Sequence, residues 1–250
     1  YDIVIPIGPW SIYTVNHNSP TFWYCLTPIR IFYDLYNYTL ENSSFAKGII
    51  LKLWKNWRVP KDQEAVKKID KIACIAKNVS SRIEKYYGRE SSVIYPPTDI
   101  SKFHFKEFGD FFLVVQRFIP NKRTDIIIKA FAKMPDKKLV VIGEGPEEAR
   151  LKVLAKGHDN IEFVRYDISR EELLDYYARC LSTIYVSKDE DFGYIPVESM
   201  AAGKPCIGAN EGGLKETIVN GKTGFLIKPD VQNLINAVKK MTPEKAESMK

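Results

Sequence analysis

The sequence is poor in the residues that build metal centres and in the long apolar runs that cross membranes. Its 250 residues include only four cysteines and three histidines, with no C-x-x-C pair, so zinc-site spacing is absent. No uninterrupted stretch of about 18 apolar residues occurs, and the N-terminus lacks the order of a signal peptide. We therefore expect a cytoplasmic protein with buried, reduced cysteines and no bound metal.

The composition is that of a folded protein with little net charge. Hydrophobic residues make up 45% and charged residues 27%, which excludes a disordered chain. The net charge of +6 is small for this length, and we expect no nucleic-acid partner. Segment 45–71 holds eight Lys or Arg residues against three acidic residues, a net charge of +5. Nearly all of the basic excess is therefore local.

Short β-branched and aromatic runs alternate with helical patterns along the chain. The strand-like runs lie at 2–7, 21–26, 71–75, 92–95, 111–115, 138–142, 161–164, 182–186, 205–208 and 224–227. Apolar residues follow helical spacing at 124–134, 146–156, 170–179, 195–202 and 231–241. This alternation predicts an α/β protein with parallel sheets covered by helices.

Two domains are expected, joined by a proline-containing linker. Residues 111–250 contain about six strands in alternation with helices, the content of a complete Rossmann-like doubly wound domain. Residues 98–110 form the expected linker, after two prolines in succession. Residues 1–97 hold fewer strands and resemble part of a second such domain. We therefore expect further residues before Tyr1 and after Lys250.

Two loops that follow predicted strands carry residues suited to phosphate. Arg117 and Lys122 stand five residues apart after the run 111–115, where together they could neutralise a diphosphate. Gly143 and Gly145 follow the next strand, before Pro146. These glycines fit a nucleotide-binding turn, but an ordinary strand-to-helix turn explains them equally well.

The strongest pattern is the run 187–203, which begins just past a strand and ends a short helix. Glu190 precedes that helix and Glu198 lies within it, so both carboxylates could accept hydrogen bonds from one polyhydroxyl ligand. The free backbone N–H groups at the start of the helix lie near Gly193, Tyr194 and Ile195. Such a helix end attracts phosphate.

This run resembles the E-x7-E signature of family 4 of the retaining GT-B glycosyltransferases, the glycosyl transferases group 1. The family form reads E-x-F-G-x-x-x-x-E-A-M-A-x-G-x-P-V-I. The matching positions are Glu190, Phe192, Gly193, Glu198, Met200, Ala201, Gly203, Pro205 and Ile207, with Ser199 and Cys206 as departures. The similarity extends to Arg117 with Lys122, 143–146, 212–216 and 220–224, although Gln116 replaces a small residue.

The resemblance implies a GT-B fold of two Rossmann-like domains and a role for each motif. Arg117 and Lys122 would hold the donor diphosphate, Glu198 the ribose, and Glu190 the hydroxyls of the transferred sugar, so Glu190, Arg117 and Lys122 are the expected catalytic residues. The other expected donor-binding residues are Phe192, Gly193, Tyr194, Ile195, Gly143, Gly145, Gly212 and Gly213. The family needs no cofactor or divalent metal and retains the anomeric configuration. An alternative interpretation takes 189–191 as a D-x-D metal site of the GT-A type.

The acceptor side departs from the family pattern. Residues 24–30 resemble the segment Y-x-H-T-P-x-R, but Leu26 stands at the histidine position and can neither donate nor accept a hydrogen bond. Ile75 and Ala76 stand where relatives often carry Asn-Ser. The expected function is transfer of a hexose, with mannose from GDP-mannose as the donor guess, to a glycan or lipid-linked acceptor. The alternatives are a weakened nucleotide-sugar-binding protein and a sugar-nucleotide epimerase of similar fold.

Segment 45–71 has two possible roles. At helical spacing its apolar residues share one face and its cations Lys47, Lys52, Lys55 and Arg58 share the other. The helix could pack its apolar face on the sheet of its own domain. It could instead lie on an anionic membrane surface, as a lipid-linked acceptor would require, with the protein peripheral on the inner face of the membrane.

Overall fold

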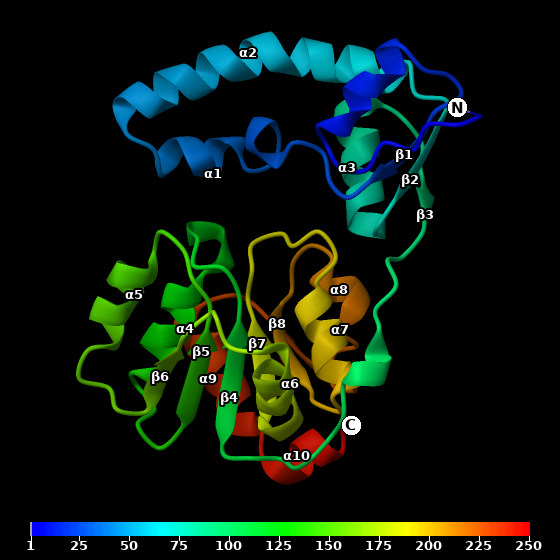
Figure 1. Ribbon diagram of the computed structural model, residues 1–250. Helices are drawn as coiled ribbons and strands as arrows, with labels where there is room; N and C mark the ends of the chain where they lie inside the picture. The colour runs from blue at the N-terminus through cyan, green and yellow to red at the C-terminus, as the bar shows by residue number, and fades with distance from the viewer. Residues whose placement is uncertain (1) are drawn as a thin grey trace. The chain divides into compact units, whose positions relative to one another are not determined.

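The computed structural model describes residues 2–250 and divides into two compact units, Tyr1–Pro96 and Pro97–Lys250. Each unit contains a parallel β-sheet with helices, so the prediction of an α/β protein is confirmed (Figure 1). Residues 98–110 belong to the second unit, where they include the short 3-10 helix η3 (Ile100–Lys102).

The first unit has a three-stranded parallel sheet in the order β1-β2-β3. Its strands are β1 (Phe22–Cys25), β2 (Lys71–Cys74) and β3 (Ser92–Val93). Its helices are η1 (Ser11–Asn16), η2 (Arg30–Phe32), α1 (Tyr36–Glu41), α2 (Phe45–Lys67) and α3 (Lys77–Tyr87).

The expected strand at 2–7 is wrong. This segment runs beside β1 but makes only two isolated bridges, from Val4 to Thr21 and from Ile7 to Tyr24. Pro6 has no N–H to donate, and it contributes only its carbonyl, which accepts a hydrogen bond from the Tyr24 N–H at 3.0 Å. A regular ladder therefore does not form there.

The second unit has a six-stranded parallel sheet in the order β6-β5-β4-β7-β8-β9. Its strands are β4 (Phe111–Val115), β5 (Lys138–Ile142), β6 (Ile161–Val164), β7 (Ser182–Tyr185), β8 (Cys206–Ala209) and β9 (Gly224–Ile227). This is the order of a doubly wound domain, with the switch point between β4 and β7. The predicted alternation of strands and helices is confirmed here.

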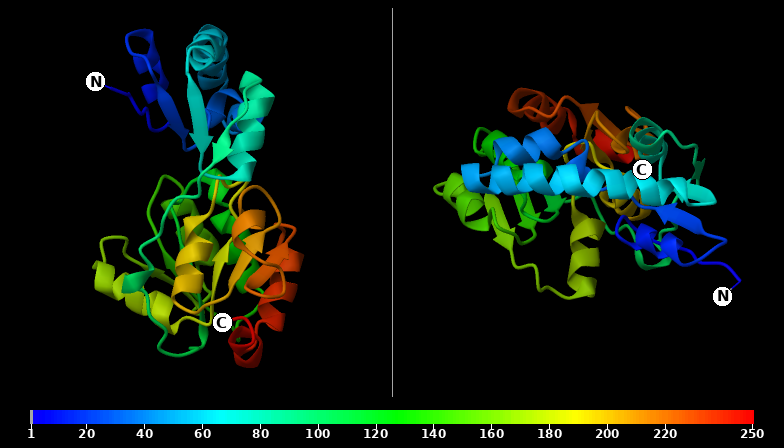
Figure 2. Two further views of the ribbon diagram at one scale, coloured as in Figure 1. Left: turned by 90° about the vertical axis from the view of Figure 1, so that its right-hand side faces the viewer. Right: turned by 90° about the horizontal axis from the view of Figure 1, so that it is seen from above.

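Helices cover both faces of that sheet (Figures 1 and 2). They are η4 (Pro120–Lys122), α4 (Thr124–Phe131), α5 (Glu148–Ala155), α6 (Arg170–Arg179), α7 (Tyr194–Ala201), α8 (Leu214–Thr217), α9 (Val231–Lys240) and α10 (Pro243–Glu247). Successive strand residues serve opposite faces: Phe112 and Val114 belong to the core under α4 and α9, whereas Leu113 packs toward Tyr177 of α6. Burial of both faces explains why these strands are apolar without alternation.

All four cysteines are buried thiols, as predicted. Cys180 and Cys206 lie within the second unit, where burial raises the pKa of both thiols to about 12. A thiol with so high a pKa stays protonated and acts as a small apolar side chain.

Helix α2 contradicts the expectation that its apolar face packs on the sheet. Ile49, Ile50, Leu53 and Trp57 are exposed, although Trp54 stacks on Trp10. The packed side instead carries Leu51, Ala65 and Val66, together with cations that lie against aromatic rings. Lys55 Nζ lies 3.6 Å from the Tyr36 ring centroid, and the Arg58 guanidinium lies 4.2 Å from that of Tyr13.

Candidate active site

Four loops meet at the carboxyl edge of the six-stranded sheet, after β4, β5, β7 and β8. Backbone hydrogen bonds join them in pairs. The Phe118 N–H donates to the Glu144 carbonyl, the Lys188 N–H to the Asn121 carbonyl and the Gly213 N–H to the Glu190 carbonyl, each at 2.7 Å. In a doubly wound sheet this edge is where ligands bind. The loops that carry the predicted donor motifs are therefore held against one another by their backbones.

The predicted glycines stand where these loops touch. A Cβ at Gly143 would lie 1.9 Å from the Gln116 carbonyl oxygen, and one at Gly212 would lie 2.4 Å from that of Glu190. Gly212 also has a φ of +54°, which favours glycine. Gly145 and Gly213 face backbone atoms of the neighbouring loops in the same way. Close loop-to-loop packing is thus a structural reason for all four glycines, and donor contact by them stays a prediction.

Lys122 and Glu190 form an ion pair at the centre of these loops. Lys122 Nζ donates to Glu190 Oε2 at 2.7 Å and to the Tyr185 hydroxyl at 2.5 Å. Ser187 Oγ donates to the same carboxylate oxygen at 2.6 Å. Burial opposes ionisation of Glu190, but the Lys122 ammonium and the hydrogen bonds outweigh it, so the pKa of this carboxyl is lowered. The structure therefore brings together two predicted catalytic residues, with Glu190 ionised.

Two arginines of the β4 loop lie in different surroundings. Arg117, the third predicted catalytic residue, is exposed near the beginning of the loop. Arg123 adopts a left-handed φ of +54° and donates to Glu211 Oε2 at 2.9 Å. Glu211 also accepts from the Asp189 backbone N–H at 3.3 Å, so this pair ties three loops together. Sequence reasoning missed it because Arg123 and Glu211 are 88 residues apart.

The N-terminus of α7 lies directly after the Glu190 loop. Gly193 is its N-cap residue with a φ of +95°, and a Cβ there would lie 2.6 Å from the Leu214 side chain. Phe192 is buried and meets Tyr194 edge to face, with ring centroids 5.4 Å apart. Tyr194 is exposed and Ile195 half-buried. The backbone N–H groups that begin this helix are thus at the edge where a phosphate was predicted.

Glu198 belongs to a second hydrogen-bonded set, on α7 and α6. The Tyr177 hydroxyl donates to Glu198 Oε2 at 2.8 Å, and the Tyr177 ring is fully buried. Burial raises the pKa of Glu198, although the Tyr177 hydrogen bond and the charge of Arg170 lower it in part.

A cavity of about 420 Å³ lies beside Glu198. Its other lining residues are Phe103, Val115, Ile142, Tyr166, Ile168, Ser169, Arg170, Leu173, Leu174 and Tyr177. Apolar walls with one carboxylate and one guanidinium suit a flat heterocycle joined to a hydroxylated sugar. Sequence reasoning missed all of these residues except Glu198. The available signal was their position, since Val115 and Ile142 end strands and Tyr166 follows one.

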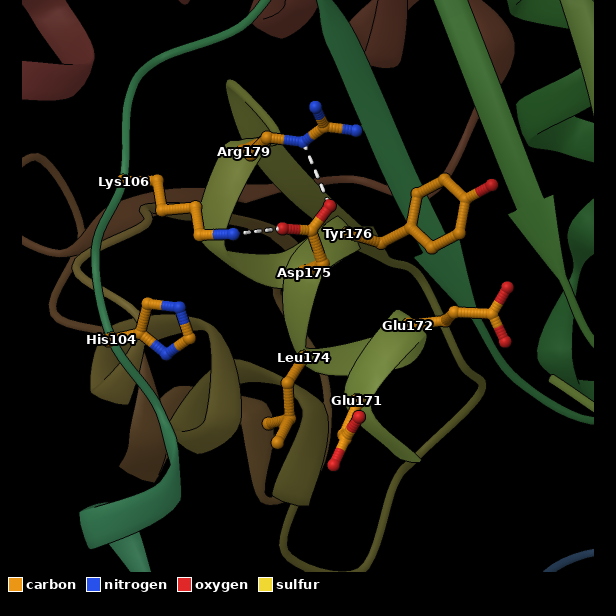
Figure 3. Close-up of a pocket in the computed structure, with 8 residues that line it drawn as sticks. All are labelled: His104, Lys106, Glu171, Glu172, Leu174, Asp175, Tyr176 and Arg179. Carbon is orange, nitrogen blue, oxygen red and sulfur yellow. Dashed lines mark hydrogen bonds and ion pairs between the residues drawn. The ribbon is translucent and has the colours of Figure 1, made fainter. Parts of the chain in front are cut away.

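A larger cavity of about 570 Å³ lies along α6, outside these loops (Figure 3). Three of its charged groups are paired with one another, with Asp175 accepting from Lys106 at 2.5 Å and from Arg179 at 3.0 Å. Figure 3 shows both cations directed at that one carboxylate. We assign this cavity no part in the site.

Within residues 2–250, no group of three or more His, Cys, Asp or Glu side chains is arranged to hold a metal ion. The Glu190 carboxylate of the 189–191 sequence is engaged with Lys122 and Ser187.

In the first unit, Leu26 follows the last residue of β1 and is 39% exposed. Ile75 and Ala76, which follow β2, are both buried. The acceptor-side positions that depart from the family pattern thus lie at the carboxyl ends of the strands of their own sheet.

Comparison with known sequences places the second unit in a family. The sequence model described as glycosyl transferases group 1 matches residues 97–250. An uncharacterized glycosyltransferase of Methanocaldococcus jannaschii is 28% identical over 66% of this chain and 47% of its own length. An alpha-1,3/1,6-mannosyltransferase of Dictyostelium discoideum is 36% identical over 52% of this chain and 31% of its own. The N-acetyl-alpha-D-glucosaminyl L-malate synthase of Bacillus anthracis is 30% identical over 58% and 40%. The chain thus spans less than half the length of these relatives.

Solved structures match the fold over the whole chain. Sucrose-phosphate synthase from Thermosynechococcus elongatus aligns with a TM-score of 0.79 and 18% identity, covering 100% of this chain and 67% of that chain. Anabaena HepE in complex with UDP-glucose aligns with a TM-score of 0.68 and 15% identity, covering 100% and 92%. The GT-B fold is confirmed, with only three strands in the sheet of the first unit. Together with the match over 97–250, the findings show that this chain belongs to the glycosyl transferases group 1 family.

Proposed function

We propose that this protein is a retaining glycosyltransferase that transfers a hexose from a nucleotide-diphosphate sugar to a glycan or lipid-linked acceptor. The observation that carries the proposal is the pairing of Lys122 with Glu190, together with an apolar cavity lined by Glu198 in the same unit. A nucleotide sugar needs an apolar site for its base, acceptors for its hydroxyls and cations for its diphosphate. All three kinds of group are at the carboxyl edge of this sheet.

Each group would bind one part of the donor. The base would enter the 420 Å³ cavity, and Glu198 would accept hydrogen bonds from the ribose hydroxyls. Lys122, Arg117 and the N–H groups that begin α7 would hold the diphosphate. Glu190 would accept hydrogen bonds from the transferred sugar. Because the Lys122 ammonium already neutralises the Glu190 carboxylate, we expect the donor diphosphate to share Lys122 with it.

The proposed reaction needs no metal, because Lys122 and Arg117 stabilise the negative charge that develops on the departing diphosphate. The acceptor oxygen bonds to the sugar C1 while the bond from C1 to the diphosphate oxygen breaks. The acceptor proton passes to an oxygen of the leaving phosphate, on the same face of the sugar, so the configuration is retained.

GDP-mannose is the proposed donor. The mannosyltransferase relative from Dictyostelium supports a mannosyl donor, whereas the HepE structure with UDP-glucose keeps a uridine nucleotide as the competing choice. The proposed location is the cytoplasm, where the enzyme would be peripheral on the inner face of the membrane and would bind its nucleotide sugar. Within residues 2–250, no helix is long and apolar enough to cross a bilayer.

A panel of nucleotide sugars in a thermal-shift assay tests the donor. A donor present at about 100 times its Kd stabilises the native state by about 2.7 kcal/mol, which raises the Tm by several degrees. We expect GDP-mannose to give the largest shift, and labelled donor should then yield a glycosylated product with the anomeric configuration retained. A larger shift with UDP-glucose would overturn the donor assignment. An epimerised sugar nucleotide as product would overturn the transferase reaction.

A catalytically weakened nucleotide-sugar-binding protein is the second candidate. Leu26 favours it, because an exposed leucine stands where the family pattern has a hydrogen-bonding histidine. This candidate predicts a thermal shift with a donor but no transfer and no donor hydrolysis. Substitution of Leu26→His should then restore or increase turnover without changing donor affinity. A wild-type chain that transfers at the same rate as Leu26→His would leave this candidate without support.

A further inference from the structure

Helix α2 carries a continuous apolar ridge that stays largely exposed among residues 2–250. Phe45, Ile49, Leu53 and Trp57 follow each other at intervals of four residues, which keeps them on one side of the helix. Their exposed fractions are 86%, 47%, 65% and 55%. Large apolar side chains in such a row mark an interaction surface, since single exposed ones are common but a contiguous patch is not.

The charges beside this ridge are of one sign. From position 45 to 61 the helix has five Lys or Arg residues and no acidic residue. At about 100° per residue, Lys52 and Lys61 stand about a quarter turn to either side of Leu53. Both lysines are exposed, and Lys61 Nζ lies 4.0 Å from the Trp57 ring centroid. The ridge is therefore bordered by cations on both sides.

We propose that this face of α2 lies on an anionic membrane surface, with the apolar ridge at the boundary between headgroups and acyl chains. A helix with lysines beside aromatic and aliphatic residues gains from both apolar burial and attraction to anionic lipid. Tryptophan is favoured at that boundary because its ring is apolar and its N–H is polar. A second copy of this chain is a poorer occupant, because two such faces would bring like charges together.

The inference deepens the lipid-linked acceptor of the proposed function and rests on it for its biological purpose. The binding itself requires no donor, no transfer and no acceptor. A lipid-binding measurement and a donor-binding measurement therefore succeed or fail separately.

The first experiment is sedimentation of the full 250-residue chain with vesicles. We expect binding to vesicles of phosphatidylcholine with about 30% phosphatidylglycerol, and weaker binding to phosphatidylcholine alone. The double variant Leu53→Gln with Trp57→Gln should weaken binding about 100-fold. Glutamine is a good helix former, so the helix should persist. Val153→Gln is the matched control, because Val153 is a 71% exposed apolar residue on helix α5.

The second experiment removes charge and leaves the ridge intact. Lys52→Gln with Lys61→Gln, the two lysines that border the ridge, should weaken binding to anionic vesicles about 30-fold, at about five-fold for each basic residue. The control is Lys239→Gln with Lys240→Gln, two exposed lysines in the last turn of α9. Raising the salt concentration to 1 M should remove most of the advantage of anionic over neutral lipid.

Three results would overturn the inference. One is equal binding of wild type and the Leu53/Trp57 double variant to anionic vesicles. Another is no preference for anionic over neutral lipid. The third is a concentration-dependent dimer in sedimentation velocity that the double variant abolishes, which would identify a second copy as the occupant. The donor-induced thermal shift, measured on the same variants, should equal that of wild type and shows that the donor domain is intact.

Discussion

Glu190 and Glu198 are eight residues apart and follow the same strand, yet their surroundings give them opposite properties. Both carboxyls are largely enclosed, and burial is the largest influence on each pKa. At Glu190 the Lys122 ammonium at 2.7 Å and the neighbouring hydrogen bonds together overcome burial, and the pKa is lowered. At Glu198 the neutral Tyr177 hydroxyl at 2.8 Å is too weak to offset burial, and the pKa of Glu198 is raised.

The difference shows that the character of each carboxylate is set by a residue from another element of the fold. Lys122 comes from the loop after β4, and Tyr177 comes from α6. Two similar carboxyls can thus serve different tasks because their environments separate their pKa values. Glu190 is held ionised beside a cation, which suits a position close to developing charge. Glu198 is held by a neutral donor beside an apolar cavity, which suits recognition of a nucleoside.

The largest effect should come from removing the cation that distinguishes the two sites. Lys122→Ala removes the cation that faces the enclosed Glu190 carboxylate and takes a charge from the proposed diphosphate site. We expect the rate of transfer to fall about 1000-fold, measured as release of nucleoside diphosphate from the donor. Lys129→Ala on α4, an exposed lysine paired with Asp125, is the control. A rate for Lys122→Ala within three-fold of wild type would contradict the assignment.

The next effect separates sugar contact from nucleoside contact. Glu198→Gln should raise the Kd for free nucleoside diphosphate about 10-fold, because the ribose loses a charged acceptor. Glu190→Gln should change that Kd by less than about three-fold but lower the transfer rate about 100-fold. Titration calorimetry with the nucleoside diphosphate and initial-rate measurements give the two numbers. Equal sensitivity of nucleoside diphosphate binding to both substitutions would remove the distinction.

A smaller effect should appear in the pH dependence of binding. As the pH falls from 7 toward the ordinary range of a glutamic acid, Glu198 takes up a proton before Glu190 does, because the pKa of Glu198 is raised and that of Glu190 is lowered. Protonation removes a charged acceptor for the ribose, so affinity for the nucleoside diphosphate should fall about three- to five-fold. The phosphate groups titrate in the same range, and Glu198→Gln therefore provides the baseline. The wild type and Glu190→Gln should both lose more affinity at low pH than Glu198→Gln does. Parallel pH curves for these three proteins would refute the role of Glu198 protonation.

The smallest effect concerns the positioning of Glu198 by Tyr177. Tyr177→Phe removes one hydroxyl from a buried site and should weaken nucleoside diphosphate binding about three-fold at pH 7. The hydrogen bond from Tyr177 lowers the pKa of Glu198, so its loss should move the pH dependence of binding to higher pH. A merely structural role for Tyr177 would lower thermal stability and leave that pH dependence in place. Tyr176→Phe on the same helix, half-buried and next in sequence, is the control.

The sheet of the second unit was predictable because its strands are short, apolar and separated by helical patterns. The runs 111–115, 138–142, 161–164 and 224–227 have the predicted bounds. Segment 2–7 has the same β-branched composition but includes Pro6, and only tertiary context decides whether the ladder continues. The prediction that the apolar face of helix α2 packs on the sheet was wrong for a related reason. The helical pattern identified the apolar side, but the rings of Tyr36 and Tyr13 lie against cations on the packed side.

The site was predictable only where its residues form an ordered motif. Glu190, Glu198, Arg117 and Lys122 could be selected from loop position and spacing. Tyr177 could not, because a tyrosine on an amphipathic helix is usually a core residue and nothing local connects it to Glu198. The cavity beside Glu198 was missed for the same reason, since its walls come from strand ends and α6.

The glycine contacts between the loops imply that the loop glycines and the cavity walls should change in sequence at different rates during evolution. At Gly143 and Gly212 any side chain would strike a neighbouring backbone, so replacement there should be lost from a population through misfolding, whatever the donor. The cavity walls are side chains such as Tyr166 and Ile168, which can be exchanged while the loop backbones stay in place. Under the proposed function, preference for one base over another can therefore drift among descendants of this protein without disturbing the packed loop backbones.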